Sequence, residues 1–374
     1  MNKPKVSIVI PVYNVESYVE DCIKSVMRQT YDGWMECIVV DDGGTDYSIA
    51  IVERMIAEYD GPIQFKILHH DHNRGLSAAR NTGMDTATGD YVFFLDSDDE
   101  LTDDCIEKLT EPLKTEWYDV VTGSTRNVNL LSPNELEETR NIGEETVANE
   151  GLFRDSMPLR TYRKEWRWEA WNKLCRTEFL RKFHIRFKDG IIFEDVPWTF
   201  EIACLARSLY IIGDTTYIYK KRKGSIMDTC TKEKYIRYYP VIIKETARVV
   251  DAYRIKNVVL FPFFNNLFST VLGYTSEAKS KYVLEYKSLR PFVKANLNYI
   301  ILTNRFHVKR LLHDVHYLLP KRIAPYWQYN VYVRRKRIVK KVKARFHISL
   351  QRLRDLKQIK NKWLFSFFLA PILP

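Results

Sequence analysis

Short apolar runs alternate with segments of helical period over the first hundred residues of the chain. The apolar runs predict strands at residues 6–10, 35–40, 63–69 and 91–95. Between them, apolar side chains three and four residues apart predict helices at 15–28, 49–59 and 76–86. Strands and helices that alternate at this length form a parallel sheet with helices on its faces. The pattern therefore predicts an α/β fold built on a mainly parallel sheet.

The fourth apolar run ends in residues 96–99 (DSDD), the acidic motif. A run without polar alternation, residues 91–95, is typical of a strand buried on both faces. Asp96 and Asp98 follow it two residues apart, so on an extended backbone their carboxylates point the same way. Such a pair suits Mg²⁺ or Mn²⁺, which keep open positions for phosphate oxygens. The alternative is that Asp98 or Asp99 only caps a helix that starts near Leu101.

Two further polar motifs follow predicted strands. Residues 11–14 (PVYN) end the first strand, and residues 41–46 (DDGGTD) end the second. The carboxyl ends of parallel strands meet at one edge of the sheet, and ligands bind at that edge. Helix capping alone does not produce this coincidence. Because an acidic turn can accept hydrogen bonds from a base or a ribose, we expect a nucleotide site here.

The C-terminal part of the chain differs from the rest in charge and period. The chain has 374 residues, enough for two or more units, and a formal net charge of +11. Residues 305–362 hold 18 Lys and Arg against 2 Asp and Glu, whereas residues 1–304 hold 40 against 45. After residue 227 the period is helical. The predicted helices cover 235–252 and 258–278, and the predicted units are an α/β domain at 1–225, an α-helical domain at 226–330 and a basic tail at 331–374.

The basic tail has the pattern of a helix that lies on a membrane. Its apolar positions recur at threes and fours while Lys and Arg fill the other faces, as in amphipathic helices of the membrane interface. Residues 363–374 are aromatic and apolar but too few to span a bilayer. Nucleic acid would also attract the basic residues, yet it offers no place to bury this end, so we expect anionic lipid and no nucleic acid. The apolar stripe consists of Val339, Val342, Phe346, Leu350, Leu353, Leu356, Ile359 and Trp363.

Cysteine usage and the chain start bear on the compartment. Six cysteines are scattered without a C-x-x-C pair, which indicates buried thiols in a reducing compartment. The first residues lead directly into a strand without a signal-peptide pattern, and no apolar run of about 18 residues occurs. We therefore expect a cytoplasmic protein, peripheral on the inner face of the cell membrane.

Six motifs, in this order and spacing, resemble those of family 2 glycosyltransferases of the GT-A fold, of the bacterial polysaccharide-assembly type. Together they cover about the first 225 residues. Gly44 departs from the pattern, since the family more often has serine there; glycine loosens the turn without changing its chemistry. The motifs are PVYN (11–14), VDDGGTD (40–46), NRGLSAARNTG (73–83), GDYVFFLDSDD (89–99), WNKLCRTEFL (171–180) and FEDVPWTF (193–200).

The resemblance implies an inverting, metal-dependent transfer of a sugar from a UDP-sugar to a hydroxyl of a saccharide acceptor, with a lipid-linked acceptor suggested. Direct displacement needs a single carboxylate base, which takes the proton of the attacking hydroxyl. Carried over by motif, Pro11, Tyr13 and Asp42 hold the uracil and ribose, and Arg80 lies near the diphosphate and the acidic motif. Asp96 and Asp98 hold Mn²⁺ or Mg²⁺, with Asp98 the more direct ligand, and Asp195 of the catalytic pair Glu194–Asp195 is the general base.

Several of these residues have a structural alternative. Asp195 stands before Val196 and Pro197, the pattern of a helix N-cap with proline in the first turn. The apolar residues 191–193 favour a catalytic role, because partial desolvation raises the pKa of a carboxyl group. The basic segment 220–225 is either a loop that closes over the diphosphate or a solvated turn.

The aromatic and histidine clusters are weaker candidates for functional residues than the acidic motifs. Trp166, Trp168 and Trp171 could stack on an acceptor sugar, but core packing is the better interpretation. His69, His70 and His72 are interpreted as loop residues near the nucleotide site, since no fourth metal ligand stands at a defined spacing. For the whole chain the alternative function is a non-catalytic nucleotide-sugar-binding scaffold whose basic tail binds nucleic acid or membrane. The intact acidic motif together with Glu194 and Asp195 favours catalysis.

Overall fold

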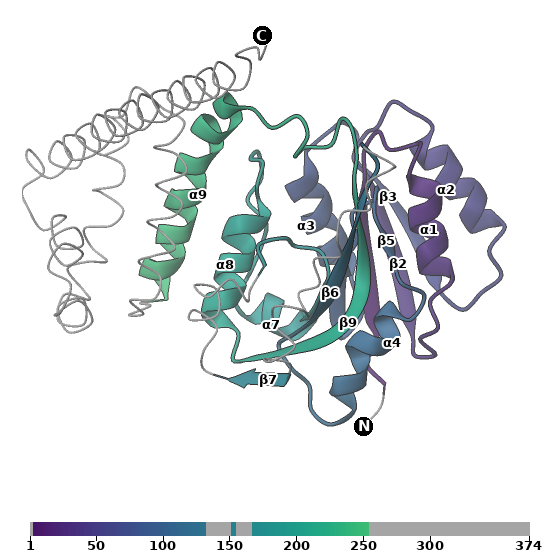
Figure 1. Ribbon diagram of the computed structural model, residues 1–374, viewed down its shortest axis with the longest axis horizontal. Coiled ribbons are helices and arrows are strands. Elements are labelled where there is room, and N and C mark those ends of the chain that lie inside the picture. The colour runs from purple at the N-terminus through teal and green to yellow at the C-terminus, as the bar shows by residue number, and fades with distance from the viewer. Residues whose placement is uncertain (1–2, 132–150, 155–166, 254–374) are drawn as a thin grey trace, which may run out of the picture. The chain divides into compact units, whose positions relative to one another are not determined.

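The computed structural model describes residues 3–131, 151–154 and 167–253 (Figure 1). The chain divides into two compact units, Met1–Thr275 and Ser276–Pro374, and all described residues belong to the first. The predicted helix at 258–278 and the predicted tail at 331–374 lie outside the described residues, and the predicted unit boundaries stay predictions. Within the described part of the chain no helix is long and apolar enough to cross a membrane.

The parallel part of the sheet forms as predicted, and the α/β fold class is confirmed. Its strands lie in the order β3-β2-β1-β4, and all three neighbouring pairs are parallel. Val12 pairs with Asp41, and Asp41 pairs with His69, so the polar motifs after three strands stand side by side. The elements are β1 (Val6–Val12), α1 (Val19–Met27), β2 (Met35–Asp41), α2 (Ser48–Ala57), β3 (Gln64–His69), α3 (Leu76–Thr86) and β4 (Tyr91–Phe94).

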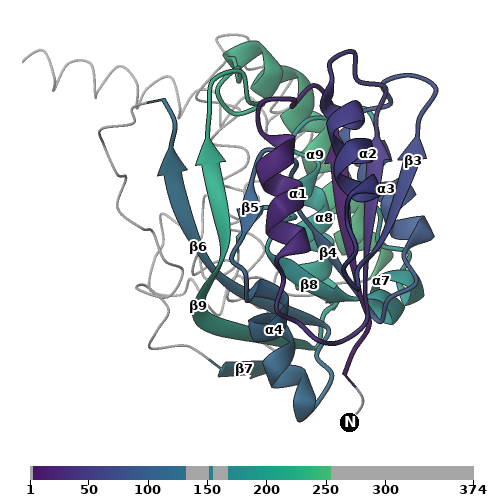
Figure 2. The same ribbon diagram turned by 90° about the vertical axis from the view of Figure 1, so that its right-hand side faces the viewer.

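The remaining strands extend the sheet beyond β4 in mixed directions. The sheet continues in the order β4-β8-β6-β9-β5, with β7 paired to β9 (Figure 2). The β4–β8, β6–β8, β5–β9 and β7–β9 pairs are antiparallel, and the β6–β9 pair is parallel. This half brings β9 back to the acidic end of β4. The elements are β5 (Glu100–Leu101), β6 (Val120–Asn129), β7 (Gly151–Arg154), β8 (Lys173–Arg176) and β9 (Ser208–Lys221).

Helices cover both faces of the sheet (Figure 1). Alternate residues of β1 serve different cores: Ile8 and Ile10 pack with α1, α2 and α4, whereas Val9 packs with α3, α7 and α8. All residues of β4 are fully buried, as predicted for a strand covered on both sides. Helix α9 packs on α8 within the same compact unit. The elements not yet given are α4 (Cys105–Thr110), η1 (Glu111–Lys114), α7 (Thr177–Lys182), α8 (Asp195–Leu205) and α9 (Lys232–Ala252).

Two local predictions differ from the structure. No helix starts near Leu101, because Glu100–Leu101 form β5 and pair with Ile218 and Tyr217, and α4 begins only at Cys105. Strand β6, for which no strand was predicted, runs as far as Asn129. The cysteines are free; Cys22, Cys37, Cys105 and Cys175 are buried, and Cys204 and Cys230 are partly exposed.

Candidate active site

The ends of β1, β2 and β3 form the nucleotide side of the candidate site. Tyr13 follows β1 directly and is 45% exposed, so its ring is available for stacking. Asp42 follows β2 and is buried. Its Oδ1 accepts hydrogen bonds from His70 Nδ1 at 2.7 Å and from the Arg74 backbone N–H at 2.9 Å, and its Oδ2 accepts from the Gly75 N–H at 2.8 Å. Three donors therefore fix the carboxylate in place.

The loop after β3 holds Asp42 through His70. The second ring nitrogen of His70 lies 2.9 Å from the Thr82 hydroxyl on α3, so the imidazole spans from helix to acidic turn. His69 lies 3.0 Å from Asp41, and the exposed His72 pairs with Asp71. His69 ends β3, so only His70 and His72 are loop residues as interpreted, and His69 and His70 both contact the acidic turn.

The turn after β2 needs glycine at position 43. Gly43 has a φ of +69°, a region that side chains disfavour. A Cβ there would meet the backbone of His72 at 2.8 Å, too close for any side chain. Glycine thus lets the β2 turn approach the loop that carries Asn73 and Arg74.

The acidic motif does not continue the strand, and here the geometric prediction is wrong. A backbone hydrogen bond from the Asp99 N–H to the Asp96 carbonyl, 3.0 Å, turns the chain directly after β4. Because the backbone is no longer extended, Asp96 and Asp98 face different cations, Arg80 and Arg222. Asp99 caps no helix: its carboxylate accepts from the Tyr217 hydroxyl at 2.8 Å and from the Lys220 N–H at 2.7 Å.

Arg80 on α3 joins the acidic motif to the start of α8. Its side chain is buried, with Nη2 2.6 Å from Asp96 Oδ1 and Nη1 2.7 Å from Glu194 Oε1. Burial alone lowers the pKa of a guanidinium, but the Asp96 and Glu194 carboxylates outweigh it and raise the pKa of Arg80. Residues 80, 96 and 194, far apart in the sequence, thus form one ionic cluster. Any direct contact of Arg80 with a diphosphate stays a prediction.

Glu194 and Asp195 open helix α8 at the same cluster. The N-cap interpretation of Asp195 is wrong, because Glu194 holds the cap position and makes no side-chain cap hydrogen bond. Burial, followed by the neighbouring Glu194 charge, raises the pKa of Asp195 to about 8. Burial also raises the pKa of Glu194, against the opposing effect of Arg80. A carboxyl group whose pKa lies near neutrality is suited to general-base work.

The residue before this pair is held in a strained conformation. Phe193 has a φ of +63°, which is a true outlier for a bulky side chain. Its ring stacks on Tyr235 of α9 with centroids 4.9 Å apart and meets Tyr239 edge-on at 5.5 Å. Strained residues of this kind persist only where their surroundings fix them. Helix α9 therefore supports the start of α8, a role that no sequence pattern indicated.

The end of β9 lies against the acidic motif. Arg222 Nε donates to Asp98 Oδ2 at 2.7 Å, and Lys220 Nζ pairs with Glu100 at 2.6 Å and with Asp21 at 3.2 Å. Burial, followed by the Asp96 charge, raises the pKa of Asp98, while Arg222 lowers it. The basic segment at 220–225 thus begins in contact with the acidic motif and is not only a solvated turn.

The carboxyl groups of the site suit a divalent cation whose remaining ligands come from the substrate. Arg80 pairs with Asp96 and Glu194, Arg222 pairs with Asp98, and the carboxyl groups of Asp99 and Asp195 stand beside these residues in the chain, so carboxyl groups outnumber guanidinium groups here. Within the described ranges no three His, Cys, Asp or Glu side chains are arranged to hold an ion on their own. Mg²⁺ typically binds through one or two carboxylates plus substrate phosphates, which agrees with this arrangement.

Further predicted residues lie in the sheet. Pro11 is buried inside β1, opposite Val40 of β2, and its contact with a nucleotide stays a prediction. Trp171 is buried and stacks on Tyr217 with centroids 4.4 Å apart, so its interpretation as a core residue is confirmed, whereas Trp166 lies outside the described residues. Burial lowers the pKa of Lys173, on β8, to about 8.

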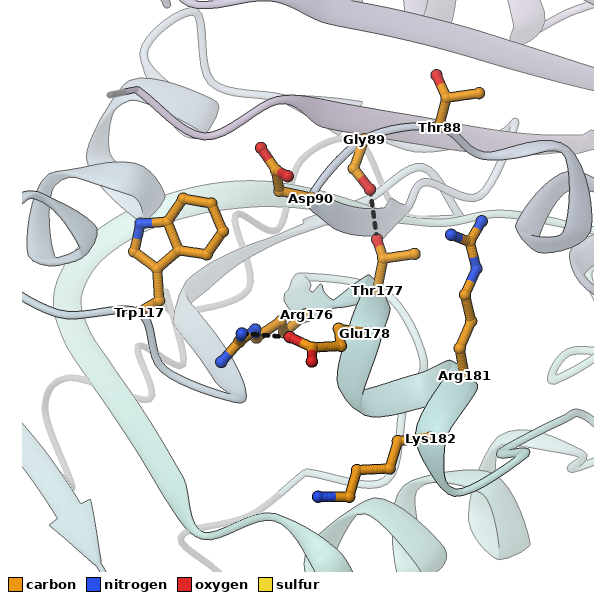
Figure 3. A pocket seen from close by; sticks show the side chains of 9 residues that line it. All are labelled: Thr88, Gly89, Asp90, Trp117, Arg176, Thr177, Glu178, Arg181 and Lys182. Carbon is orange, nitrogen blue, oxygen red and sulfur yellow. Dashed lines mark hydrogen bonds and ion pairs between the residues drawn. The ribbon is translucent and has the colours of Figure 1, made fainter. Parts of the chain in front are cut away.

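A pocket of about 670 Å³ lies at the opposite end of β4 (Figure 3). Gly89 and Asp90, which precede the strand, line it together with Trp117, with Arg176 at the end of β8 and with Arg181 of α7. Both arginines already have partners: Arg176 pairs with Glu178 and lies over the Trp117 ring, and Arg181 donates to the Ala87 carbonyl. The acidic motif follows the other end of β4, so this pocket is not part of the candidate site.

Comparison with known proteins gives the same assignment over the N-terminal half. Residues 7–185 match the family model described as glycosyl transferase family 2. The chain is 29% identical over 230 residues to glycosyltransferase GlyG of Streptococcus pneumoniae serotype 4, covering 60% of this chain and 73% of that protein. It is 31% identical over 232 residues to EpsJ of Bacillus subtilis, an uncharacterized glycosyltransferase, covering 60% of this chain and 63% of that protein.

A solved structure shares the fold. The crystal structure of S. aureus TarS 1–349 in complex with UDP-GlcNAc superposes with a TM-score of 0.57 at 22% identity. The match covers 78% of this chain and 81% of the TarS chain. At this identity the likeness shows the architecture of the sheet and its helices.

Proposed function

The chain belongs to glycosyl transferase family 2 and has the GT-A fold, and from this premise we propose that it transfers a sugar from a UDP-sugar to a hydroxyl of a saccharide acceptor, with inversion at the anomeric carbon. Direct displacement of UDP, assisted by a divalent cation and an aspartate base, is the proposed mechanism. The products are a glycoside and UDP.

A single observation carries this proposal. Arg80 joins Asp96, at the end of β4, to Glu194, at the start of α8, through hydrogen bonds of 2.6 and 2.7 Å. This cluster brings the end of β4 close to the residue before Asp195, which supports a shared site for the acidic motif and the candidate base. Burying so many charges is costly, and such clusters with shifted pKa values are typical of functional sites.

The donor-binding assignment rests on the ends of β1 and β2. Tyr13 offers an exposed ring for the uracil, and Asp42 offers a fixed carboxylate as an acceptor for a base or ribose donor. The fixed geometry matters because a preoriented acceptor loses little freedom on binding. A UDP-sugar as donor is further supported by the TarS complex, in which the same fold holds UDP-GlcNAc.

In the proposed step the acceptor hydroxyl attacks the anomeric carbon while Asp195 takes its proton. The new bond forms to the acceptor oxygen, and the bond from the anomeric carbon to the β-phosphate oxygen breaks with its electron pair on UDP. Arg80 keeps Asp96 and Glu194 in position throughout, since its bond to Glu194 is buried and its bond to Asp96 is partly buried. Asp98 and Asp96 would hold Mn²⁺ or Mg²⁺, which when bound supplies Lewis-acid neutralisation of the diphosphate.

The acceptor and location are proposed from the sequence. A basic amphipathic stretch with an apolar end suits binding to anionic lipid on the inner face of the cell membrane. Such a placement would bring the enzyme to a lipid-linked saccharide. The names of relatives such as EpsJ give no acceptor, so the acceptor class rests on the tail and on the family.

The test is UDP release from a panel of UDP-sugars, with Mn²⁺ and with EDTA. We expect at least one sugar to give metal-dependent release, and we expect Asp98→Ala to abolish it. Asp103→Ala is the matched control, because this nearby carboxylate is 60% exposed and pairs only with Arg28 on the surface. Full release in EDTA with verified absence of metal, or a fully active Asp98→Ala variant, would refute the metal assignment.

A further inference from the structure

Arg222 occupies the carboxylate that is assigned to the metal. Its Nε donates to Asp98 Oδ2 at 2.7 Å, and its guanidinium lies over the Tyr18 ring, 4.7 Å from the centroid. The two side chains are only 13% and 21% exposed, for Arg222 and Asp98 respectively. A charge-assisted bond with this little exposure is stronger than a surface ion pair.

The segment around Arg222 is anchored to the same acidic turn. The Lys220 N–H donates to Asp99, and Lys220 Nζ pairs with Glu100 and Asp21. Arg222 follows two residues later and is therefore delivered to Asp98 by the end of β9. Gly224, with a φ of +77°, then turns the chain away. The contact is thus a consequence of the sheet topology, which pairs the end of β9 with β5, the strand directly after the acidic motif.

Arg222 and a metal ion cannot both use Asp98 in this way. Asp98 is only 21% exposed, so an unpaired negative charge there would be costly, and the hydrogen bond from Arg222 offsets this cost. A divalent cation bound by the same carboxylate would repel the guanidinium at close range. Metal binding without another anion would therefore leave Arg222 without its partner.

We infer that Arg222 is the counter-cation of Asp98 in the donor-free enzyme and that a metal must displace it. This inference rests on the metal dependence proposed above. A nucleoside diphosphate that arrives with the metal brings new negative charge for the displaced arginine, whereas the free metal does not. The Arg222–Asp98 pair therefore weakens the binding of the metal on its own. It also increases the factor by which the diphosphate strengthens metal binding.

The test is Mn²⁺ binding, followed by the electron paramagnetic resonance signal of free Mn²⁺, with and without UDP. For Arg222→Gln we expect Mn²⁺ alone to bind about tenfold tighter than in the wild type, as for the loss of one competing charged hydrogen bond. The factor by which UDP tightens Mn²⁺ binding should fall correspondingly. Arg222→Lys, which keeps a cation, should stay within about threefold of the wild type.

Lys223→Gln is the matched control, since it removes the same charge from the neighbouring exposed residue without a bond to Asp98. If Lys223→Gln tightens Mn²⁺ binding as much as Arg222→Gln, the effect is general electrostatics and the inference is wrong. Asp98→Asn distinguishes a failure of the metal assignment from a failure of the inference about Arg222. If Asp98→Asn loses Mn²⁺ binding while Arg222→Gln binds as the wild type does, only the inference fails. If Asp98→Asn binds Mn²⁺ normally, the metal assignment fails and the inference with it.

Discussion

Replacing Asp195 with asparagine should abolish transfer and stabilise the protein. In the unfolded chain the Asp195 carboxyl has a pKa near 3.8, whereas the folded site raises it to about 8. Between these values the folded state binds a proton that the unfolded state has released, so the stability contribution of this group falls as pH rises. At pH 7 the span is about three pH units, which gives ~4 kcal/mol as an upper limit.

Asparagine has no proton to lose in this range. The variant should therefore match the wild type in stability near pH 4 and exceed it increasingly up to pH 8, by about 2–4 kcal/mol. Transfer should fall by about 10²-fold or more, because the amide cannot accept the proton. UDP-sugar affinity should remain near wild type, since Asp195 is not assigned to donor binding.

The assays are urea unfolding at pH 4, 6 and 8, calorimetric titration of the UDP-sugar, and transfer to a soluble acceptor. Asp85→Asn is the control, because its carboxylate is 56% exposed and pairs with Arg186 at the surface. In the wild type, kcat/KM should also rise with pH and level off above about pH 8, where Asp195 is ionised. A stability difference that does not change with pH, or a variant that keeps transfer, would refute the reasoning.

Three further predictions concern other parts of the chain. Arg80→Met should lower the free energy of unfolding by about 3–5 kcal/mol in urea titrations, because it leaves the buried Glu194 and the partly buried Asp96 without their arginine partner; an unchanged midpoint would contradict the cluster. Tyr13→Ala should weaken UDP binding by about tenfold in calorimetry at unchanged stability, since the ring is exposed; unaltered affinity would exclude stacking. Deletion of residues 331–374 should abolish sedimentation with anionic vesicles and spare UDP-sugar hydrolysis. Continued vesicle binding by the shortened protein would show that the tail is not the membrane-binding segment. Salt-dependent binding of the whole protein to duplex DNA in place of vesicles would indicate a nucleic-acid-binding tail.

The sequence predicted those parts of the fold whose side chains follow the burial pattern. Strand β4 is uniformly apolar and buried, β1 and β2 are mostly apolar and buried except at the partly exposed Asp41, and α3 has the predicted bounds. Strand β6 escaped prediction because it buries polar residues, Thr122, Ser124 and Thr125. These are satisfied by partners distant in sequence: the Thr122 hydroxyl donates to the Asn172 carbonyl, and the Asn172 amide donates to Ser124 and Thr125. A local pattern does not contain such pairings.

In the candidate site, too, local patterns predicted positions but not the pairings between distant residues. Motif spacing placed Asp42, Asp96 and Asp98 at one edge of the sheet, because parallel strands share that edge. Which carboxylate meets which cation depends on the turn at Asp99 and on the return of β9, and neither has a local signal. The pairing of Arg80 with Glu194 spans 114 positions of the chain, so no periodicity could reveal it.

The stack of Phe193 on α9 has a practical consequence for recombining this enzyme with others. Exchanges of donor specificity between glycosyltransferases join the catalytic module of one protein to the rest of another. A junction placed at residue 225, where the strand pattern ends, would supply Phe193 with foreign residues in place of Tyr235 and Tyr239. The left-handed backbone before Glu194 would lose the contacts that hold it, and the hybrid would bind donor with a displaced base. A junction after Ala252 keeps α9 with α8, so it is the boundary at which a hybrid should retain turnover.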